Sequence, residues 1–191
     1  AEDLTRQARE AMAQCGLLLA SERLAHSLHQ LADIQPCAAA QLAQTALAAD
    51  DAHVGILVSG DAGFFGAAKT LQAALQEYGE VRLICGISSM QLLCAKLCVS
   101  YDDVLWLSLH GRKGSLIGAV SYHKRVFALT SGTNNAQKLC QWLADAGLGG
   151  VRVSIGENLG APAERILTGS AEELSKEPCG DLAALLVEND F

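Results

Sequence analysis

Hydrophobic and polar residues alternate along this chain with two different periods. Several segments repeat apolar residues every three or four positions, as amphipathic helices do; they cover residues 2–15, 41–51, 66–79, 89–100 and 134–150. Short apolar runs with strand-like composition lie between or after them, at residues 16–21, 53–59, 80–86, 102–111, 125–132, 151–158 and 181–190. Strands that alternate with helices predict an α/β protein with largely parallel sheets.

Five connections that follow predicted strands are richer in Gly, Ser, Thr, Asn and charged residues than chain reversal requires. They are residues 59–66, 85–91, 108–115, 129–135 and 155–166. In parallel sheets, ligands gather at the carboxyl ends of the strands. Five such connections therefore predict a large polar-lined cleft that is assembled from several strand ends.

The first of these connections carries Gly60, Gly63 and Gly66. Their spacing does not match the dinucleotide-binding fingerprint, and no Gly-Lys-Ser/Thr ending of a P-loop follows. The chain also lacks the serine elbow and triad order of hydrolases. This connection is either a ligand loop of another kind or a tight turn that allows close helix packing.

Composition and charge narrow the class of protein. Half of the 191 residues are hydrophobic and 18% are charged, which suits one large domain or two small α/β lobes. The net charge of −7 argues against a surface that binds nucleic acid, and no apolar run is long enough to span a bilayer. Seven scattered cysteines without a C-x-x-C pair indicate reduced thiols rather than a metal site. We therefore expect a cytoplasmic protein that binds neither metal, membrane nor nucleic acid.

Residues 57–71, 80–97, 108–112, 129–135 and 155–166, in this order and at these intervals, resemble the tetrapyrrole methylases. The resemblance covers nearly the whole chain and is closest to the cobalt-precorrin-7 C5-methyltransferase family, which includes the C5-methylating domain of precorrin-6Y methylases. Two departures stand out. Ala62 replaces the proline that usually follows the Gly-Asp pair. The family's first strand and Gly-Pro-rich loop do not appear before the first helix, and we expect either that these residues are disordered and omitted or that the protein is truncated.

The resemblance implies a two-lobed tetrapyrrole methylase fold. Each lobe would be a mostly parallel or mixed sheet flanked by helices, with the ligand cleft between the lobes. The N-terminal lobe would cover residues 1–82 and the C-terminal lobe residues 83–191. Members of the family are typically homodimers, so a homodimer is expected here as well.

The function implied by the resemblance is methylation of C5 of a (cobalt-)precorrin in cobalamin biosynthesis. S-adenosyl-L-methionine would donate the methyl group and leave as S-adenosyl-L-homocysteine. Because a sulfonium methyl group moves to an electron-rich ring carbon, the protein mainly has to align the two reactants. The alternatives are methylation at another ring position, or a non-catalytic cofactor-binding lobe that partners a C15-methylating and decarboxylating enzyme. The sequence leaves open whether the substrate carries cobalt.

The resemblance also assigns the cofactor site, which would be formed by Gly60, Asp61, Ala62, Phe64, Ser88, Ser89, Thr130 and Ser131. Structural alternatives exist for several of them. Ser88 could be only the N-cap of the following helix, and Thr130 only a hydroxyl at a strand end. One of the two adjacent phenylalanines, Phe64 and Phe65, is expected to pack in the core.

A corrin intermediate carries acetate and propionate side arms that are anionic at neutral pH, so cationic groups are expected where it binds. The residues assigned to the substrate are His110, Arg112, Glu157 and Asn158. The guanidinium of Arg112 can donate two parallel hydrogen bonds to a carboxylate, unless it is only an exposed arginine in a solvated turn. Asp61 and His110 are the catalytic candidates, and His110 could equally bind the substrate. Glu157 and Asn158 could instead only form a turn.

Overall fold

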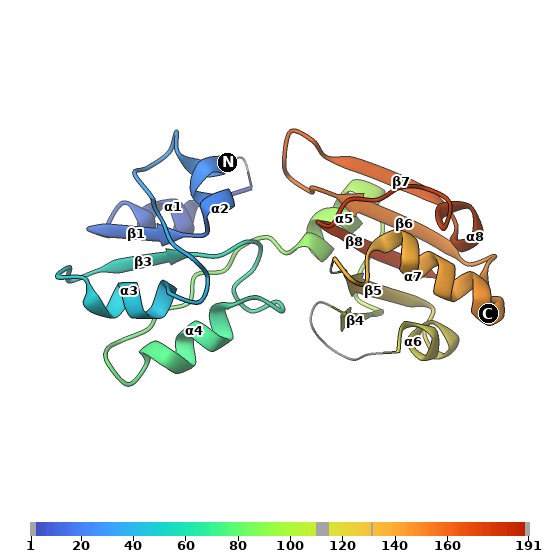
Figure 1. The fold of residues 1–191 in the computed structure, drawn as a ribbon, viewed down its shortest axis with the longest axis horizontal. Helices are drawn as coiled ribbons and strands as arrows, with labels where there is room; N and C mark the ends of the chain where they lie inside the picture. The colour runs from blue at the N-terminus through green and yellow to red at the C-terminus, as the bar shows by residue number, and fades with distance from the viewer. Residues whose placement is uncertain (1–2, 110–114, 131, 190–191) are drawn as a thin grey trace. The chain divides into compact units, whose positions relative to one another are not determined.

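The computed structural model describes residues 3–109, 115–130 and 132–189. The chain forms two compact units, Ala1–Ser88 and Ser89–Phe191 (Figure 1). The boundary expected from the sequence, after residue 82, lies a few residues earlier. Both units combine a sheet with flanking helices, which confirms the predicted α/β class.

The first unit is built around a parallel three-stranded sheet with the order β2-β1-β3. Its elements are α1 (Arg6–Met12), β1 (Leu17–Ala20), α2 (Glu22–Leu28), β2 (Gln35–Pro36), α3 (Leu42–Ala48), β3 (Val54–Leu57) and α4 (Ala68–Leu75). Figure 1 shows α1 and α2 on one side of the sheet and α3 and α4 on the other. The ends of β1 and β3 lie side by side, because Ala20 pairs with Leu57.

Alternation along β1 explains why helices cover both faces of this sheet. Leu18 and Ala20 belong to one apolar cluster with Ala25 and Leu28 of α2. Leu19, which is fully buried, points to the opposite face because successive side chains of a strand alternate. With both faces covered, the carboxyl edge of the strands is the part of the sheet that remains for a ligand.

The second unit contains a mixed five-stranded sheet with the order β4-β5-β8-β6-β7. Its elements are α5 (Ser89–Leu97), β4 (Val104–Ser108), α6 (Leu116–Tyr122), β5 (Arg125–Leu129), α7 (Ala136–Leu143), the π-helical turn η1 (Ala144–Leu148), β6 (Arg152–Glu157), β7 (Arg165–Ser170), α8 (Ala171–Leu174) and β8 (Ala183–Glu188). β4 is parallel to β5, and both β5 and β6 are antiparallel to β8. β4, β5 and β6 therefore share one direction, and their carboxyl ends lie at the same edge.

The core of the second unit has two sides. On one face, residues such as Val126, Ile155 and Leu185 pack with apolar residues of α6, α7 and α8. Phe127 and Leu186 are paired neighbours on the other face and are fully buried. α5 contacts this second face, because it lies against β8 and because its Leu93 reaches Gly156 of β6.

One strand prediction is wrong, and five elements were not foreseen. Residues 80–86 form no strand. Side chains take the place of a strand ladder there: Thr5 Oγ1 donates to Cys85 O at 3.2 Å, and Gly86 N donates to Asp61 Oδ2 at 3.1 Å. The elements that the sequence patterns did not predict are α2, β2, α6, β7 and α8. β7 is an edge strand, which explains its weak apolar pattern.

Replacing Gly156 tests the packing of α5 on the sheet. A Cβ atom at this position would lie 2.9 Å from both Leu93 Cδ1 and Leu159 Cδ2. We expect Gly156→Ala to lower the free energy of unfolding by about 1–2 kcal/mol, because overpacking a filled core is destabilising. Urea denaturation measures the effect. Gly150→Ala is the matched control, since a Cβ there would meet nothing within 4 Å. Equal midpoints for both variants would contradict the packing described.

Candidate functional site

The Gly60 loop, residues 59–66, connects β3 to α4 and has a fixed shape. Gly60 adopts φ 77°, a left-handed conformation that other residues reach only with strain. Asp61 Oδ1 accepts a hydrogen bond from Gly63 N at 2.7 Å, which closes a turn of the kind that aspartate favours. This bond explains how the turn keeps its shape although Ala62 stands where the family usually has proline.

The Gly60 loop lies directly against residues 86–88. Asp61 Oδ2 accepts the hydrogen bond from Gly86 N, and a Cβ atom on Gly86 would overlap the carbonyl oxygen of Gly60. A Cβ on Gly60 would stand 3.9 Å from Ser88 Cα. Three predicted cofactor residues, Gly60, Asp61 and Ser88, are thus brought together. Ser88 is buried, and Ser89 begins α5.

The two phenylalanines of the Gly60 loop differ in exposure and backbone. Phe64 is half-buried and its ring meets that of Phe65 edge to face, with centroids 4.9 Å apart. Phe65 is exposed and adopts φ 49°, which is unusual for an aromatic residue. Such backbone strain persists only where neighbouring structure enforces it, and it concentrates at ligand sites. The interpretation of residues 59–66 as a ligand loop stays a prediction.

In the second unit, Thr130 and Glu157 lie on either side of the first residue of β8. Thr130 follows β5, is buried, and donates from Oγ1 to Ala183 O at 2.6 Å. Glu157 ends β6 and pairs with Ala183 in the sheet. The Thr130 hydroxyl thus has the strand-end role that the sequence offered as an alternative. The predicted residues His110, Arg112 and Ser131 lie outside the described residues.

Glu157 joins three segments of the second unit. Its side chain is buried, and its two oxygens accept hydrogen bonds from Arg165 Nε at 2.6 Å and Gly180 N at 2.5 Å. Burial raises the pKa of the Glu157 carboxyl, but the hydrogen bonds from Arg165 and Gly180 and the charge of Arg165 together bring it below its ordinary value. This arrangement supports a structural role for Glu157, while substrate binding by it stays a prediction.

The connection that follows Glu157 is a compact turn. Asn158 adopts φ 48° and Gly160 φ 74°; asparagine tolerates this region better than most residues. Asn158 N donates to Leu182 O at 3.0 Å, and Gly160 N donates to Glu164 Oε2 at 2.8 Å. The motif around Asn158 therefore closes a turn, as the structural alternative expected. A substrate contact by Asn158 stays a prediction.

Sequence patterns missed the residues that complete these arrangements, namely Gly86, Arg165 and Gly180. Each donates a hydrogen bond to a carboxylate in another segment of the chain: Gly86 to Asp61, and Arg165 and Gly180 to Glu157. The repeated Gly-Asp and Gly-Glu pairs at strand ends were the available signal, since an acidic residue there needs donors. The partners themselves could not be read from local pattern.

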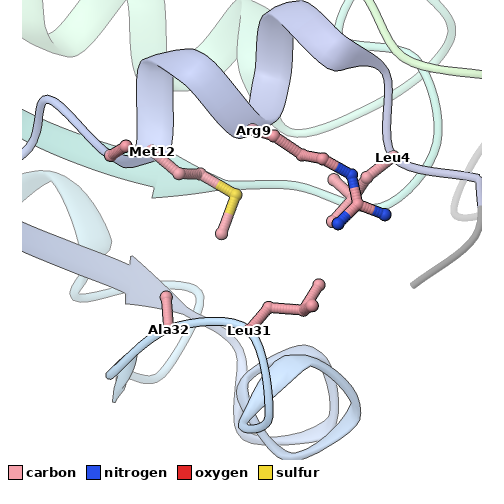
Figure 2. A pocket seen from close by; sticks show the side chains of 6 residues that line it. Leu4, Arg9, Met12, Leu31 and Ala32 are labelled. Atoms are coloured by element: carbon pink, nitrogen blue, oxygen red, sulfur yellow. The ribbon is translucent and has the colours of Figure 1, made fainter.

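A cavity of about 160 Å³ lies between α1 and the connection from α2 to β2 (Figure 2). It is lined by Leu4, Arg9, Met12, Ala13, Leu31 and Ala32. Leu4 and Met12 also pack against the apolar cluster of the first unit, and Figure 2 shows the Met12 side chain directed toward the Leu31–Ala32 backbone. Five of its six lining residues are apolar and the sixth is Arg9, so the cavity is a mainly apolar gap at the margin of the core.

Metal-binding clusters and membrane-spanning helices are both absent from the part of the chain that the structure describes. There, no group of three His, Cys, Asp or Glu side chains is arranged to hold a metal ion. Among the same residues, no helix is long and apolar enough to cross a membrane.

The lowered pKa of Glu157 predicts pH-dependent stability. A carboxyl whose pKa is lower in the folded state adds stability above its unfolded pKa of about 4.3 and loses it as the pH falls through the folded value. Glu157→Gln should lower the free energy of unfolding by about 1–2 kcal/mol at pH 7. The difference from the unmodified protein should shrink below pH ~4.

Thermal unfolding between pH 3 and 7 measures this effect. Glu172→Gln is the control, because Glu172 and its partner Lys176 are both exposed and such pairs contribute little. A pH-independent loss in Glu157→Gln would show that the ion pair is not the cause.

Comparison with known proteins identifies the family. Residues 1–175 match the family described as Tetrapyrrole (Corrin/Porphyrin) Methylases. A probable cobalt-precorrin-7 C(5)-methyltransferase of Methanocaldococcus jannaschii is 29% identical over 72% of this chain and 65% of its own length. The cobalt-precorrin-7 C(5)-methyltransferase of Salmonella typhimurium is 34% identical over 61% of this chain and 57% of its own length. A precorrin-6Y C(5,15)-methyltransferase [decarboxylating] of Sinorhizobium sp is 33% identical over 60% of this chain and 28% of its own length.

Solved structures show the same fold. The precorrin-6Y methylase of Archaeoglobus fulgidus has a TM-score of 0.70 at 21% identity, over 98% of this chain and 92% of its own. The uroporphyrin-III C-methyltransferase of Thermus thermophilus, complexed with S-adenosyl homocysteine, has a TM-score of 0.77 at 18% identity. The match covers 98% of this chain and 91% of its own. The matched segment is less than two thirds of the length of the curated relatives. The match over residues 1–175 nevertheless shows that the chain belongs to the tetrapyrrole methylase family.

Proposed function

We propose that the chain is an S-adenosyl-L-methionine-dependent methyltransferase that methylates C5 of a (cobalt-)precorrin in cobalamin biosynthesis. The names of two curated relatives support the substrate and the ring position, and the S-adenosyl homocysteine complex of a structural neighbour supports the cofactor. The observation that carries the proposal is the close contact of the Gly60 loop with residues 86–88. It joins two motifs of the family in one place.

The residues of the Gly60 loop fit a cofactor that is bound mainly through backbone groups. Gly60 and Gly63 are exposed, and without side chains they allow a ligand to approach the main chain closely. Ala62 and Phe64 would form the wall of the site, and Ser88 would contact the amino-acid end of the cofactor. When bound, the cofactor supplies a methyl group on a positively charged sulfur.

Asp61 acts in this proposal by positioning the loop. Both of its oxygens already accept backbone hydrogen bonds, from Gly63 and Gly86, so it fixes the shape of the cofactor site. Aligning a methyl donor with a ring carbon needs such rigid positioning more than it needs a nucleophile. Contacts of the cofactor with Ser89, Thr130 and Ser131, and of the substrate with His110, Arg112, Glu157 and Asn158, stay predictions.

A second candidate function is a cofactor-binding lobe that works with a C15-methylating and decarboxylating partner. The name of the Sinorhizobium relative, a C(5,15)-methyltransferase, combines both activities, and the chain matches 28% of that relative's length. Methylation at another ring position of a precorrin is the alternative within the same class. The homodimer and the cytoplasmic location stay predictions.

Gly86 provides a test of the cofactor site. We expect Gly86→Ala to weaken the binding of S-adenosyl-L-homocysteine at least tenfold, because the added Cβ would push the Gly60 carbonyl away. Isothermal titration calorimetry measures the affinity, and circular dichroism checks the fold. Gly79→Ala is the control, since its Cβ would meet nothing within 4 Å. Unchanged affinity in Gly86→Ala would remove the Gly60 loop from the cofactor site.

The reaction itself is tested with a labelled methyl donor. Incubation with ¹³C-methyl S-adenosyl-L-methionine and either precorrin-7 or cobalt-precorrin-7 should give a product whose ¹³C methyl group is on C5 by NMR. Parallel reactions with the two substrates decide whether cobalt is required. Labelling at another ring carbon would favour the alternative methylase, and cofactor binding without transfer would favour the partner-dependent lobe.

A further inference from the structure

A second cavity of the first unit lies at the carboxyl edge of its parallel sheet. Its volume is about 240 Å³, and Leu24, Leu42, Leu57 and Ala67 form much of its apolar wall. Its polar lining includes Ser21, directly after β1, and Ser59, the first residue of the Gly60 loop. Since a water molecule in the liquid occupies about 30 Å³, the cavity is large enough for a small organic group.

Arg23 stands beside this cavity with most of its hydrogen-bonding capacity unused. It belongs to α2, it is exposed, and its Nη2 donates to Ser59 Oγ at 2.7 Å. Of the carboxylates that the structure describes, none forms an ion pair with Arg23. A guanidinium has five N–H donors, so Arg23 can still bind a carboxylate with two hydrogen bonds.

Other arginines of the chain are used differently. Arg125 pairs with Asp103 at 2.9 Å, and Arg165 pairs with Glu157 at 2.6 Å. Both are in the second unit and neutralise carboxylates of the protein itself. Arg23, by contrast, is fixed by a neutral hydroxyl, which orients the guanidinium but leaves its positive charge uncompensated.

The chemistry of the cavity and of Arg23 is complementary to a short aliphatic chain that ends in a carboxylate. Methylene groups gain free energy when they leave water for an apolar wall, and the carboxylate gains charge-assisted hydrogen bonds from the guanidinium. Because the chain carries a net charge of −7, an anionic ligand needs such a local cation. Ser59 also links this position to the Gly60 loop, in which the proposed cofactor site lies.

We infer that this cavity and Arg23 form a binding subsite for one acetate- or propionate-type side arm of the tetrapyrrole substrate. Leu24, Leu42 and Leu57 contact the methylene groups of the arm, and Arg23 binds its carboxylate. The inference rests on the proposed function and extends it, because it names a residue of the first unit that selects a free carboxylate over an amide or ester.

The test uses cobyrinic acid, a cobalt corrin with free carboxylate arms, and its heptamethyl ester, which has none. Absorbance titration gives the affinity of the unmodified protein, Arg23→Met and Arg23→Lys for both probes at low and high salt. We expect Arg23→Met to weaken binding of the acid at least tenfold and to leave the ester unchanged. Arg23→Lys should lie between, because it keeps the charge and loses the two-pronged geometry. Added salt should reduce the difference.

Two controls separate the possible failures. Arg82 is exposed, belongs to the same unit and does not line the cavity. Arg82→Met therefore removes one positive charge without changing the cavity, and this variant should bind cobyrinic acid as the unmodified protein does. Calorimetry with S-adenosyl-L-homocysteine should give the same affinity for all variants. Equal loss in Arg82→Met and Arg23→Met, or no loss in either, overturns the subsite and leaves the proposed function standing. An unmodified protein that binds neither cobyrinic acid nor S-adenosyl-L-homocysteine overturns both.

Discussion

The carboxylate of Asp61 is the constraint on which the first unit's proposed cofactor site depends. One oxygen closes the turn at Gly63, and the other accepts the amide of Gly86. Backbone amides that leave water need an acceptor, and residues 80–86 have no neighbouring strand to provide one. The glycine at position 86 then lets the carbonyl of Gly60 approach. The Gly60 loop and residues 86–88 consequently cannot shift independently of one another.

The second unit uses the same kind of bond at its own strand ends. Glu157 accepts the amide of Gly180, and Glu164 accepts the amide of Gly160. The hydrogen bond from Lys96 and the amide of Gly160 lower the pKa of the Glu164 carboxyl. Hydrogen bonds to an ionised acceptor are stronger than neutral ones. Part of the acidic excess of the chain, 21 Asp and Glu against 14 Lys and Arg, therefore shapes connections that contain glycine.

Local sequence pattern predicted the elements whose apolar residues face a core. β1, β3, β4, β5, β6 and β8 came from apolar runs, and α1, α3, α4, α5 and α7 from helical periodicity. β7 was missed because an edge strand can be half polar. Residues 80–86 look like a strand, yet Thr5 and Asp61 satisfy the backbone at Cys85 and Gly86. That outcome depends on side chains distant in sequence.

Sequence also predicted the candidate site only in part, because local pattern does not show which distant segments pack together. The Gly60 loop was singled out from its residue types and Ser88 from the family resemblance, and they do lie together. Arg23 was not, because its significance comes from a cavity that three separate segments form around Ser59. Packing of this kind has no local sequence signal.

The acidity of the chain bears on how an anionic corrin could be recognised. At physiological ionic strength, exposed charges are screened beyond about 8 Å, so the net charge slows the approach of an anion more than it weakens a contact once formed. Affinity must then come from short-range hydrogen bonds in places where the protein's own carboxylates are already occupied. Glu157, Glu164 and Asp61 meet that condition, since each accepts donors from within the chain. In the first unit, Arg23 can supply such hydrogen bonds, because its described side-chain partner is the neutral hydroxyl of Ser59 and not a carboxylate.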